Sequence, residues 1–275
     1  MPELPEVETV RRELEPWLTG RVVLGVERLA PAGPKYRDLP RAVGQRVCAV
    51  ERRGKFLVMP LSEGDELVLH LGMSGVVSSE PPPAAQEGHV RVRLRLSGGA
   101  PDTLFFRDAR RFGRLLVVPA GDYRSLPTLA AMGPEPLSKT FTVAGFQRAL
   151  KRSTMAVKTY LLSQRPVAGV GNIYADEALW RARVHPETPA RHVSAAKAAL
   201  LHHAIREVLA ASLQAQGTTL NDYRTVNGEV GAYLEQLDAY GHAEEPCPRC
   251  GTPLRRTVVG QRGTVYCPRC QRRRR

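Results

Sequence analysis

The sequence predicts an α+β fold, in which a β-sandwich with an N-terminal helix precedes a helical domain that ends in a metal-binding module. Changes of pattern along the 275 residues indicate this order. Residues 21–119 contain short runs of alternating apolar and polar residues, which are typical of strands, whereas residues 142–215 contain longer segments with helical periodicity. Residues 240–275 hold four cysteines in two CxxC pairs.

The first predicted element is an amphipathic helix from Glu6 to Leu18. Val7, Val10 and Leu14 fall on one face of it. Pro5 suits the first helical position, because a helix leaves the N–H at that position unpaired. Proline and acidic residues are common in first helical turns, so by composition alone this start is typical of simple helix initiation.

Strands are predicted over residues 21–26, 55–59, 66–70, 90–96 and 103–106. The alternation is strict in residues 90–96, so we expect one buried face and one exposed face that carries Arg91, Arg93 and Arg95. A proline-containing loop at residues 79–88 precedes this strand. An all-β region of this size predicts a sandwich or a barrel.

A cluster of proline and glycine at residues 132–136 marks the end of the N-terminal domain, which we assign to residues 1–132. Residues 133–150 form a linker and the start of the helical region, and the helical domain covers residues 151–235. Helices are predicted over residues 142–151, 155–163, 172–183 and 193–215. A polar loop that contains glycine follows at about residues 217–231.

The module at residues 240–275 contains Cys247, Cys250, Cys267 and Cys270, with sixteen residues between the two pairs, and ends in a basic tail. Four thiolates at this spacing can hold one tetrahedral Zn²⁺ and leave no coordination position open, so we predict a structural zinc. Such a site indicates a reducing compartment rather than disulfide formation.

The composition indicates a polyanionic partner. The formal net charge is +13, and 34 of the 40 basic residues are arginine, whose planar guanidinium binds phosphate well. A solvated basic surface is the plain alternative. The chain has no apolar stretch of 18 residues and its start is unlike a signal peptide, so we expect a cytoplasmic protein with no membrane span. No heptads are visible, and we expect a monomer.

Pro2 is a candidate nucleophile, because removal of Met1 gives it a free secondary amine. Condensation of that amine with C1′ of a nucleotide gives an iminium cation, which acidifies the C2′–H and permits elimination of the attached phosphates. Glu3 can protonate the sugar ring oxygen and later shuttle protons. Glu6 can orient this cluster or interact with the dipole at the helix start.

Six motifs resemble those of the bacterial formamidopyrimidine-DNA glycosylases and occur in that family's order along nearly the whole chain. They begin at Met1 (MPELPEVETVRR), Arg53 (RGKFL), His70 (HLGMSG), Asp108 (DARRFG), Val167 (VAGVGNIYADE) and Tyr266 (YCPRCQ). The fifth resembles the family's helix–two-turn–helix signature, and the sixth closes a zinc finger like theirs. The resemblance implies a bifunctional DNA-repair enzyme that excises oxidised purines, chiefly 8-oxoguanine and formamidopyrimidines, from damaged double-stranded DNA and cleaves the strand by β,δ-elimination.

The resemblance also implies catalytic roles. Pro2 matches the nucleophile and Glu3 the general acid and base, while Lys55 matches a hairpin lysine that contacts a phosphate near the lesion. Without the family, Lys55 would be interpreted as a lysine that blunts a strand edge.

Met73, Arg110 and Phe112 match the residues that fill the void left by the extruded base. Extrusion leaves a gap and an orphaned partner base, which an apolar wedge and a planar guanidinium can fill and pair. Taken alone, Met73 and Phe112 would be interpreted as core residues.

The DNA contacts implied by the resemblance are His89, Arg110, Lys158, Asn172 and Arg262. Gly169 and Gly171 permit a tight turn, and Asn172 is a good N-cap for the helix that follows, so backbone N–H groups there form a phosphate site. Lys158, on the preceding helix, can reach the same phosphate. Arg262, between the two CxxC pairs, can grip phosphates that flank the lesion.

Residues 217–231 match the family's loop over the flipped base, with candidate contacts at Thr218, Thr219, Tyr223 and Tyr233. The sequence departs from the family's usual pattern at Ala109, where a proline is usual, and at Asn221, where an arginine is expected. Neither departure affects Pro2, Glu3 or the cysteines.

Three alternatives remain. The first is a glycosylase for oxidised pyrimidines that resembles endonuclease VIII, although Leu4 and the long loop at 217–231 favour the purine branch. The second is a catalytically silent DNA-binding protein with the same fold. The third, more distant, is a zinc-ribbon scaffold with no role on DNA.

Overall fold

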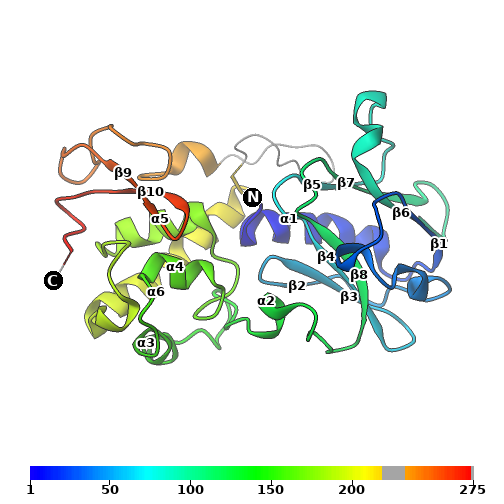
Figure 1. The fold of residues 1–275 in the computed structure, drawn as a ribbon, viewed down its shortest axis with the longest axis horizontal. Helices are drawn as coiled ribbons and strands as arrows, with labels where there is room; N and C mark the ends of the chain where they lie inside the picture. Colours follow the sequence, from blue (N-terminus) through cyan, green and yellow to red (C-terminus); the bar gives the residue numbers. More distant parts are fainter. Residues whose placement is uncertain (219–232, 274–275) are drawn as a thin grey trace. The chain divides into compact units, whose positions relative to one another are not determined.

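The computed structural model describes residues 1–218 and 233–273, which form two compact units (Figure 1). The first unit comprises Met1–Leu129 and a segment that begins at Ala215, and the second comprises Ala130–Gln214 and a C-terminal segment that begins at Tyr233. The chain thus leaves the first unit near the predicted boundary at residue 132, but residues 215–218 group with the first unit and not with the helices that precede them.

The first unit begins with a helix and continues with two antiparallel four-stranded sheets. One sheet has the strand order β1-β6-β7-β5 and the other has the order β2-β3-β4-β8. The elements are α1 (Leu4–Leu18), β1 (Val23–Arg28), β2 (Glu51–Arg53), β3 (Phe56–Pro60), β4 (Asp65–His70), β5 (Gly75–Ser78), β6 (Val90–Leu96), β7 (Thr103–Asp108) and β8 (Arg114–Pro119).

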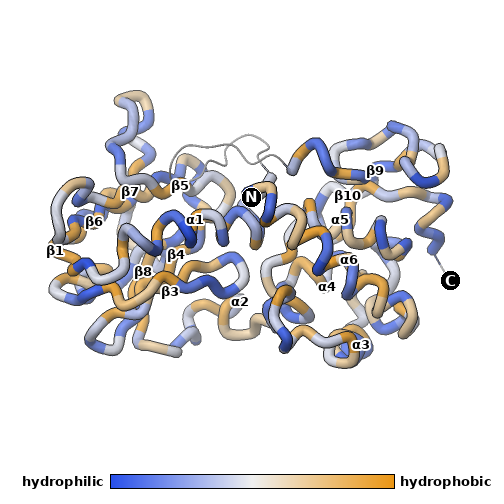
Figure 2. The backbone as a smooth tube through the Cα atoms, turned by 180° about the vertical axis from the view of Figure 1, so that it is seen from behind, coloured by the Kyte–Doolittle hydropathy of each residue, from blue (hydrophilic) through white to orange (hydrophobic). Residues whose placement is uncertain are grey.

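One hydrophobic core joins α1 to both sheets, as the predicted sandwich requires. Val10 and Leu14 of α1 lie in the same buried cluster as Phe106 of the first sheet and Val117 of the second. Figure 2 shows the apolar run of β3, which contributes Leu57 to this cluster. Burial of an aliphatic or aromatic side chain contributes about 1.5–3 kcal/mol, so this shared core is the main force that holds the two sheets together.

The element boundaries differ from the prediction in two ways. α1 begins at Leu4, so Pro5 occupies its second position and not its first. The strands β2, β5 and β8 were not predicted. β8 is buried at four consecutive residues, and a continuous apolar run lacks the alternation by which a half-buried strand is recognised.

The expected row of three exposed arginines on β6 is wrong. Arg91 is 4% exposed, and its Nε donates to the carbonyl oxygen of Asp108 at 2.8 Å. The pairing of β6 with β7 shifts register between Val90 and Val92, and such an irregularity re-aims the side chain between them. Of the three arginines, Arg93 is partly buried and only Arg95 is exposed.

The second unit consists of helices and one β-hairpin. Its elements are α3 (Val143–Lys151), α4 (Val157–Leu162), α5 (Asn172–Arg181), α6 (Ala195–Gln214), β9 (Arg255–Val259) and β10 (Arg262–Tyr266), and the short α2 (Pro127–Ala130) precedes it. α5 is central, since every residue from Ile173 to Trp180 is buried. Within the described part of the chain, no helix is long and apolar enough to cross a membrane.

Candidate functional site

Pro2 and Glu3 are buried at the start of α1. Glu6, in the first helical turn, accepts the backbone N–H of Glu3 at 2.7 Å and that of Thr218 at 2.8 Å. Gly217 has a φ of +92°, and a Cβ there would lie 2.9 Å from Oε1 of Glu6. The Glu6 carboxylate therefore fixes the N-terminal residues and residues 217–218 to the same point.

Lys55 lies in the turn between β2 and β3, directly after Gly54, whose φ is +57°, and it is 6% exposed. β2 is fixed to α1 by Arg52, whose Nε lies 2.8 Å from Oε2 of Glu8. Burial acts to raise the pKa of Glu8, but its ion pairs with Arg52 and Arg11 outweigh burial and hold that pKa below its ordinary value. The turn that carries Lys55 is thus anchored to the helix that begins at the N-terminal residues.

The three predicted void-filling residues lie on two loops that touch each other. Met73 is on the loop between β4 and β5, and Arg110 and Phe112 are on the loop between β7 and β8. A Cβ on Gly72 would lie 2.4 Å from the backbone nitrogen of Gly113, so no side chain fits between the loops. Phe112 is 48% exposed, and the Arg110 guanidinium lies 5.2 Å from its ring centroid. Phe112 is therefore not the core residue that its type alone would suggest.

His70 ends β4 immediately before the first of these loops. Its ring packs against Phe56 with centroids 4.6 Å apart, and its Nδ1 accepts the N–H of Gly72 at 3.1 Å. Burial, together with the positive charges of Arg114 and Lys55, lowers the pKa of His70 to about 3. The ring is therefore neutral near pH 7, as acceptance of the Gly72 hydrogen bond requires.

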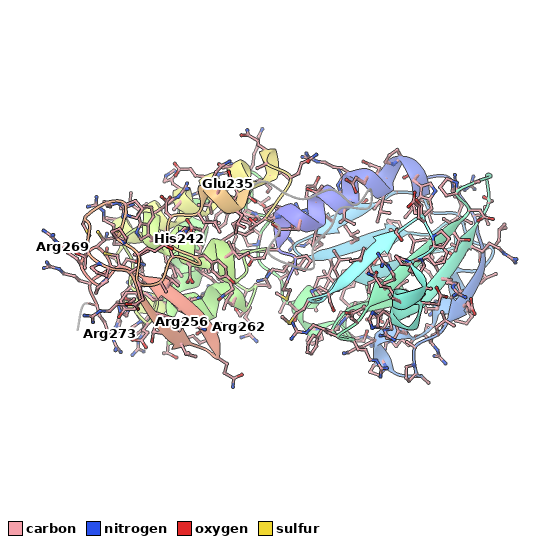
Figure 3. The ribbon with its side chains drawn as sticks, turned by 90° about the horizontal axis from the view of Figure 1, so that it is seen from above. Glu235, His242, Arg256, Arg262, Arg269 and Arg273 are labelled. Atoms are coloured by element: carbon pink, nitrogen blue, oxygen red, sulfur yellow. The ribbon has the colours of Figure 1, made fainter. Side chains whose placement is uncertain are left out.

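Asn172 is the first residue of α5, and the N-cap position belongs to Gly171, so the prediction of Asn172 as the N-cap is wrong. Its Nδ2 donates instead to the carbonyl oxygen of Gly263 in β10 at 3.0 Å, because the hairpin offers an acceptor close to the helix start. Arg262 is exposed beside the hairpin turn, and Figure 3 shows Arg256 and Arg262 on this hairpin. His89 is also exposed, at the end of the 3₁₀ segment before β6.

Lys158 lies inside the second unit, so the direct phosphate contact predicted for it is wrong. Its side chain is 0% exposed, and its Nζ lies 2.6 Å from Oδ1 of Asp176. Nζ also donates to the carbonyl oxygen of Gly263 at 3.0 Å and to Oγ1 of Thr264 at 2.8 Å. The other oxygen of Asp176 accepts the N–H of Val265 at 3.0 Å. This buried pair holds β10 against α4 and α5.

Of the predicted lesion-loop contacts, Thr219 and Tyr223 lie outside the described residues. Thr218 is buried, and its backbone is held at the start of α1 as described above. Tyr233 is fully buried in the second unit, with its ring centroid 6.2 Å from that of Tyr174. The side chain of Tyr233 is therefore part of the core in this structure, and its contact with a flipped base stays a prediction.

The four predicted zinc ligands come together at the base of the hairpin. The sulfur atoms of Cys247, Cys250, Cys267 and Cys270 all lie within 4.8 Å of one another. Zn–S bonds of about 2.3 Å in a tetrahedron place the sulfurs about 3.8 Å apart. The distance of 3.5 Å between the sulfurs of Cys250 and Cys267 is compatible with this geometry. The cluster fits one structural Zn²⁺, as predicted.

Trp180 and Arg249 support the zinc site, a role that the sequence predicts for neither of them. Nε1 of Trp180 lies 3.4 Å from Sγ of Cys247, to which it donates. The Arg249 guanidinium lies 4.0 Å from the centroid of the Trp180 ring and donates to the Trp180 carbonyl oxygen at 3.0 Å. A donor to a thiolate orients the ligand and stabilises its charge.

Two further buried carboxylates were also missed. Glu177 accepts the backbone N–H groups of Asp238, Ala239 and Tyr240 at 3.0, 2.9 and 2.8 Å, and thereby fixes the chain that leads to the zinc module. Asp108 joins the loop after β4 to the loop after β7 through hydrogen bonds from Ser74 and Gly113. Both acids lie within motifs quoted above, and an acidic residue among apolar residues and glycines is the signal that could have indicated them.

The chain matches three family models in consecutive segments. Residues 1–115 match the formamidopyrimidine-DNA glycosylase N-terminal domain, and residues 132–224 match the formamidopyrimidine-DNA glycosylase H2TH domain. Residues 244–273 match the zinc finger found in FPG and IleRS. A formamidopyrimidine-DNA glycosylase of Thermus thermophilus is 50% identical to the chain over 273 residues, which are 98% of each protein.

Solved structures agree with these matches. The crystal structure of the MutM (Fpg) protein from Thermus thermophilus has a TM-score of 0.90 at 49% identity and covers 98% of each chain. A Lactococcus lactis Fpg mutant in complex with DNA that contains Fapy-dG has a TM-score of 0.86 at 33% identity, with 99% of this chain and all of that chain covered.

The fold, the four-cysteine cluster and these matches define a zinc-finger DNA-repair glycosylase with an H2TH domain. The chain belongs to the formamidopyrimidine-DNA glycosylase family.

Removal of zinc with a chelator is expected to unfold the finger and weaken DNA binding, because metal binding and folding are coupled in such modules. Trp180→Phe removes the donor to Cys247 and is expected to release zinc to the chelator several-fold faster, as measured with a colorimetric zinc indicator. Trp17→Phe is the matched control, because its Nε1 donates to the Pro101 carbonyl oxygen in the first unit. Chelator-treated protein that keeps both its finger structure and its affinity contradicts this prediction.

Lys158→Met is expected to lower the free energy of unfolding by about 3–5 kcal/mol, because it leaves the Asp176 carboxylate buried without its partner. Urea denaturation measures the loss. Lys151→Met, which removes an exposed ammonium bonded to the Arg191 carbonyl oxygen, is the control and is expected to cost at most about 1 kcal/mol. The double change Lys158→Met with Asp176→Asn is expected to recover part of the loss. Equal losses of unfolding free energy for Lys158→Met and Lys151→Met would contradict the prediction that the buried ion pair stabilises the fold.

The protein is expected to lose stability as the pH falls from about 6.5 towards 3, because the unfolded chain protonates His70 near its ordinary pKa while the folded chain does not. Denaturation across this pH range, compared with His70→Phe, measures the contribution. His89→Phe, at an exposed position, serves as the control. An NMR titration in which the His70 ring protonates near pH 6.5 in the folded protein would refute the expectation.

Proposed function

We propose that the chain excises oxidised purines, with 8-oxoguanine and formamidopyrimidines as substrates, and then cleaves the strand at the abasic site. The observation that carries the proposal is the placement of Pro2 beside the buried Glu3, at a helix start that Glu6 holds in place. The Lactococcus lactis complex with DNA that contains Fapy-dG supports this substrate class. We further propose that the protein acts on damaged duplex DNA as a monomer.

The first chemical step requires removal of Met1, which frees the Pro2 nitrogen. The nitrogen lone pair attacks C1′, the bond from C1′ to the base breaks, and the base leaves with that electron pair and takes up a proton. Glu3 protonates the ring oxygen O4′. The proton that the departing base takes up is the one from the Pro2 nitrogen, so cleavage of the C1′–O4′ bond gives an iminium between that nitrogen and C1′. This iminium has no N–H proton to lose and stays cationic.

The second step is elimination. Loss of a proton from C2′ expels the 3′ phosphate, and loss of a proton from C4′ then expels the 5′ phosphate, with the iminium as the electron sink in both cases. Glu3 shuttles these protons, and Lys55, from its turn beside α1, contacts a phosphate near the lesion.

The proposed DNA contacts come from both units. His89, Arg110 and Arg262 are exposed cations or potential cations, and Asn172 opens α5, where backbone N–H groups favour a phosphate. Met73, Arg110 and Phe112 fill the void left by the extruded nucleotide. The net charge of +13 favours all of these contacts with DNA.

Borohydride trapping tests the mechanism. Untagged protein incubated with a duplex that contains 8-oxoguanine opposite cytosine is expected to give a covalent protein–DNA band, because borohydride reduces an iminium to a stable amine. A Gly-Ser extension that keeps Pro2 inside the chain is expected to abolish the band but not salt-sensitive DNA binding. No band from untagged protein with binding intact would favour a silent DNA-binding protein.

Glu3→Gln tests the role of Glu3 as the general acid. It is expected to slow base excision by about 10²–10⁴-fold while trapping at a preformed abasic site is retained to a greater extent. Glu15→Gln, on the exposed end of the same helix, is the control and is expected to leave excision unchanged.

A parallel assay on thymine glycol duplexes separates the purine branch from the endonuclease VIII-like alternative, which would process thymine glycol faster than 8-oxoguanine.

A further inference from the structure

Asp108, the last residue of β7, binds to both void-filling loops at once. Its side chain is 0% exposed. Its Oδ1 accepts the hydroxyl of Ser74 at 2.6 Å, and its Oδ2 accepts the backbone N–H of Gly113 at 2.6 Å. Ser74 belongs to the loop that carries Met73, and Gly113 ends the loop between β7 and β8. One buried carboxylate therefore links the two loops.

Ser74 extends this link to a proposed DNA-binding residue. Its Oγ donates to Asp108 and accepts the backbone N–H of Arg110 at 3.0 Å. The Arg110 N–H thus donates to the Ser74 hydroxyl, and that hydroxyl donates to the Asp108 carboxylate. A hydroxyl is the smallest side chain that can donate and accept at the same time, so neither alanine nor cysteine reproduces both bonds well.

The surroundings leave these groups little freedom. A Cβ on Gly75 would lie 2.0 Å from the carbonyl oxygen of Leu71, and a Cβ on Gly113 would lie 2.7 Å from Cζ of Phe106. The backbone of Asp108 is held from β6 by the buried guanidinium of Arg91, whose Nε donates to the Asp108 carbonyl oxygen at 2.8 Å.

The exposed ends of the loops contrast with this rigid base. Arg111 has a φ of +58°, an uncommon conformation for a residue with a side chain, and its carbonyl oxygen accepts a hydrogen bond from Lys35. Phe112 next to it is half exposed. The loop tip is therefore presented to solvent in a defined conformation that a buried network supports from below.

We propose that Ser74 is a positioning residue for base extrusion, which holds Met73, Arg110 and Phe112 in one arrangement before DNA binds. This role rests on the proposed function, because it assumes that these three side chains enter the void. Insertion of flexible loops would require their ordering at the moment of extrusion, and a pre-formed arrangement removes that entropic cost from the barrier.

Ser74→Ala tests the proposal. Single-turnover excision of 8-oxoguanine from duplex DNA is expected to slow about tenfold, which corresponds to the loss of a hydrogen bond to a charged group. Ser74→Thr, which keeps the hydroxyl, is expected to restore most of the rate. Ser62→Ala is the matched control, since the Ser62 hydroxyl accepts the backbone N–H of Arg46 at 3.0 Å in the same unit, and it is expected to change nothing.

A double-mutant cycle separates positioning from general destabilisation. In a Phe112→Ala background, Ser74→Ala is expected to slow excision less than it does in the wild-type background, because one of the three side chains that it positions is absent. Borohydride trapping on single-stranded DNA with an abasic site, which has no void to fill, is expected to be unchanged by Ser74→Ala.

Equal losses in the two backgrounds, or an equal loss of trapping on single-stranded DNA, would overturn the positioning role in favour of a structural one. A wild-type protein that neither excises 8-oxoguanine nor forms a trapped adduct would instead overturn the proposed function and, with it, this role. The two failures are therefore distinguishable, because only the second affects the unmodified protein.

Discussion

A carboxylate taken out of water must accept hydrogen bonds, and this constraint fixes the functional segments of the protein. Glu6 accepts backbone N–H groups from residues 3 and 218, and Asp108 accepts hydrogen bonds from the loop after β4 and from the loop after β7. Glu177 accepts three N–H groups from residues 238–240. Each acid joins segments that are distant in sequence, and an unpaired carboxylate at any of these positions would be strongly unfavourable. The same constraint that stabilises the fold therefore also specifies where the loops lie.

The second unit applies this rule to a buried ion pair. Lys158 and Asp176 satisfy each other and the backbone of β10, so the charge that the sequence offered as a DNA contact stabilises the hairpin instead. Arg262, two residues before Thr264, remains exposed on that hairpin. The lysine thus supports the hairpin that carries Arg262 from inside the unit. The zinc cluster, with Trp180 against Cys247, anchors the other end of the same hairpin.

The glycines complete the description of the site. Gly72 and Gly113 allow two loops to touch, and Gly217 allows the backbone to approach Glu6. At Gly72 and Gly217 the backbone is also left-handed, so both space and conformation exclude a side chain. Close approach of this kind brings together residues whose motifs lie well apart in the chain, and it leaves the larger side chains Arg110 and Phe112 to project into solvent.

The sequence by itself determined the fold class and the zinc ligands, because alternation, helical periodicity and CxxC spacing are local patterns that report directly on local structure. Its family followed from the resemblance of six motifs in their order along the chain. It also located α1 and most strands of the sandwich. Only the tertiary structure decided which polar residues are buried and which are exposed. Arg91, Lys158 and Tyr233 have types that suit a surface, yet each is buried by segments that lie far away in the chain. Asp108 and Ser74 acquired their roles in the same way, because a hydrogen bond across two loops depends on how the strands pair and leaves no periodic signal in the sequence.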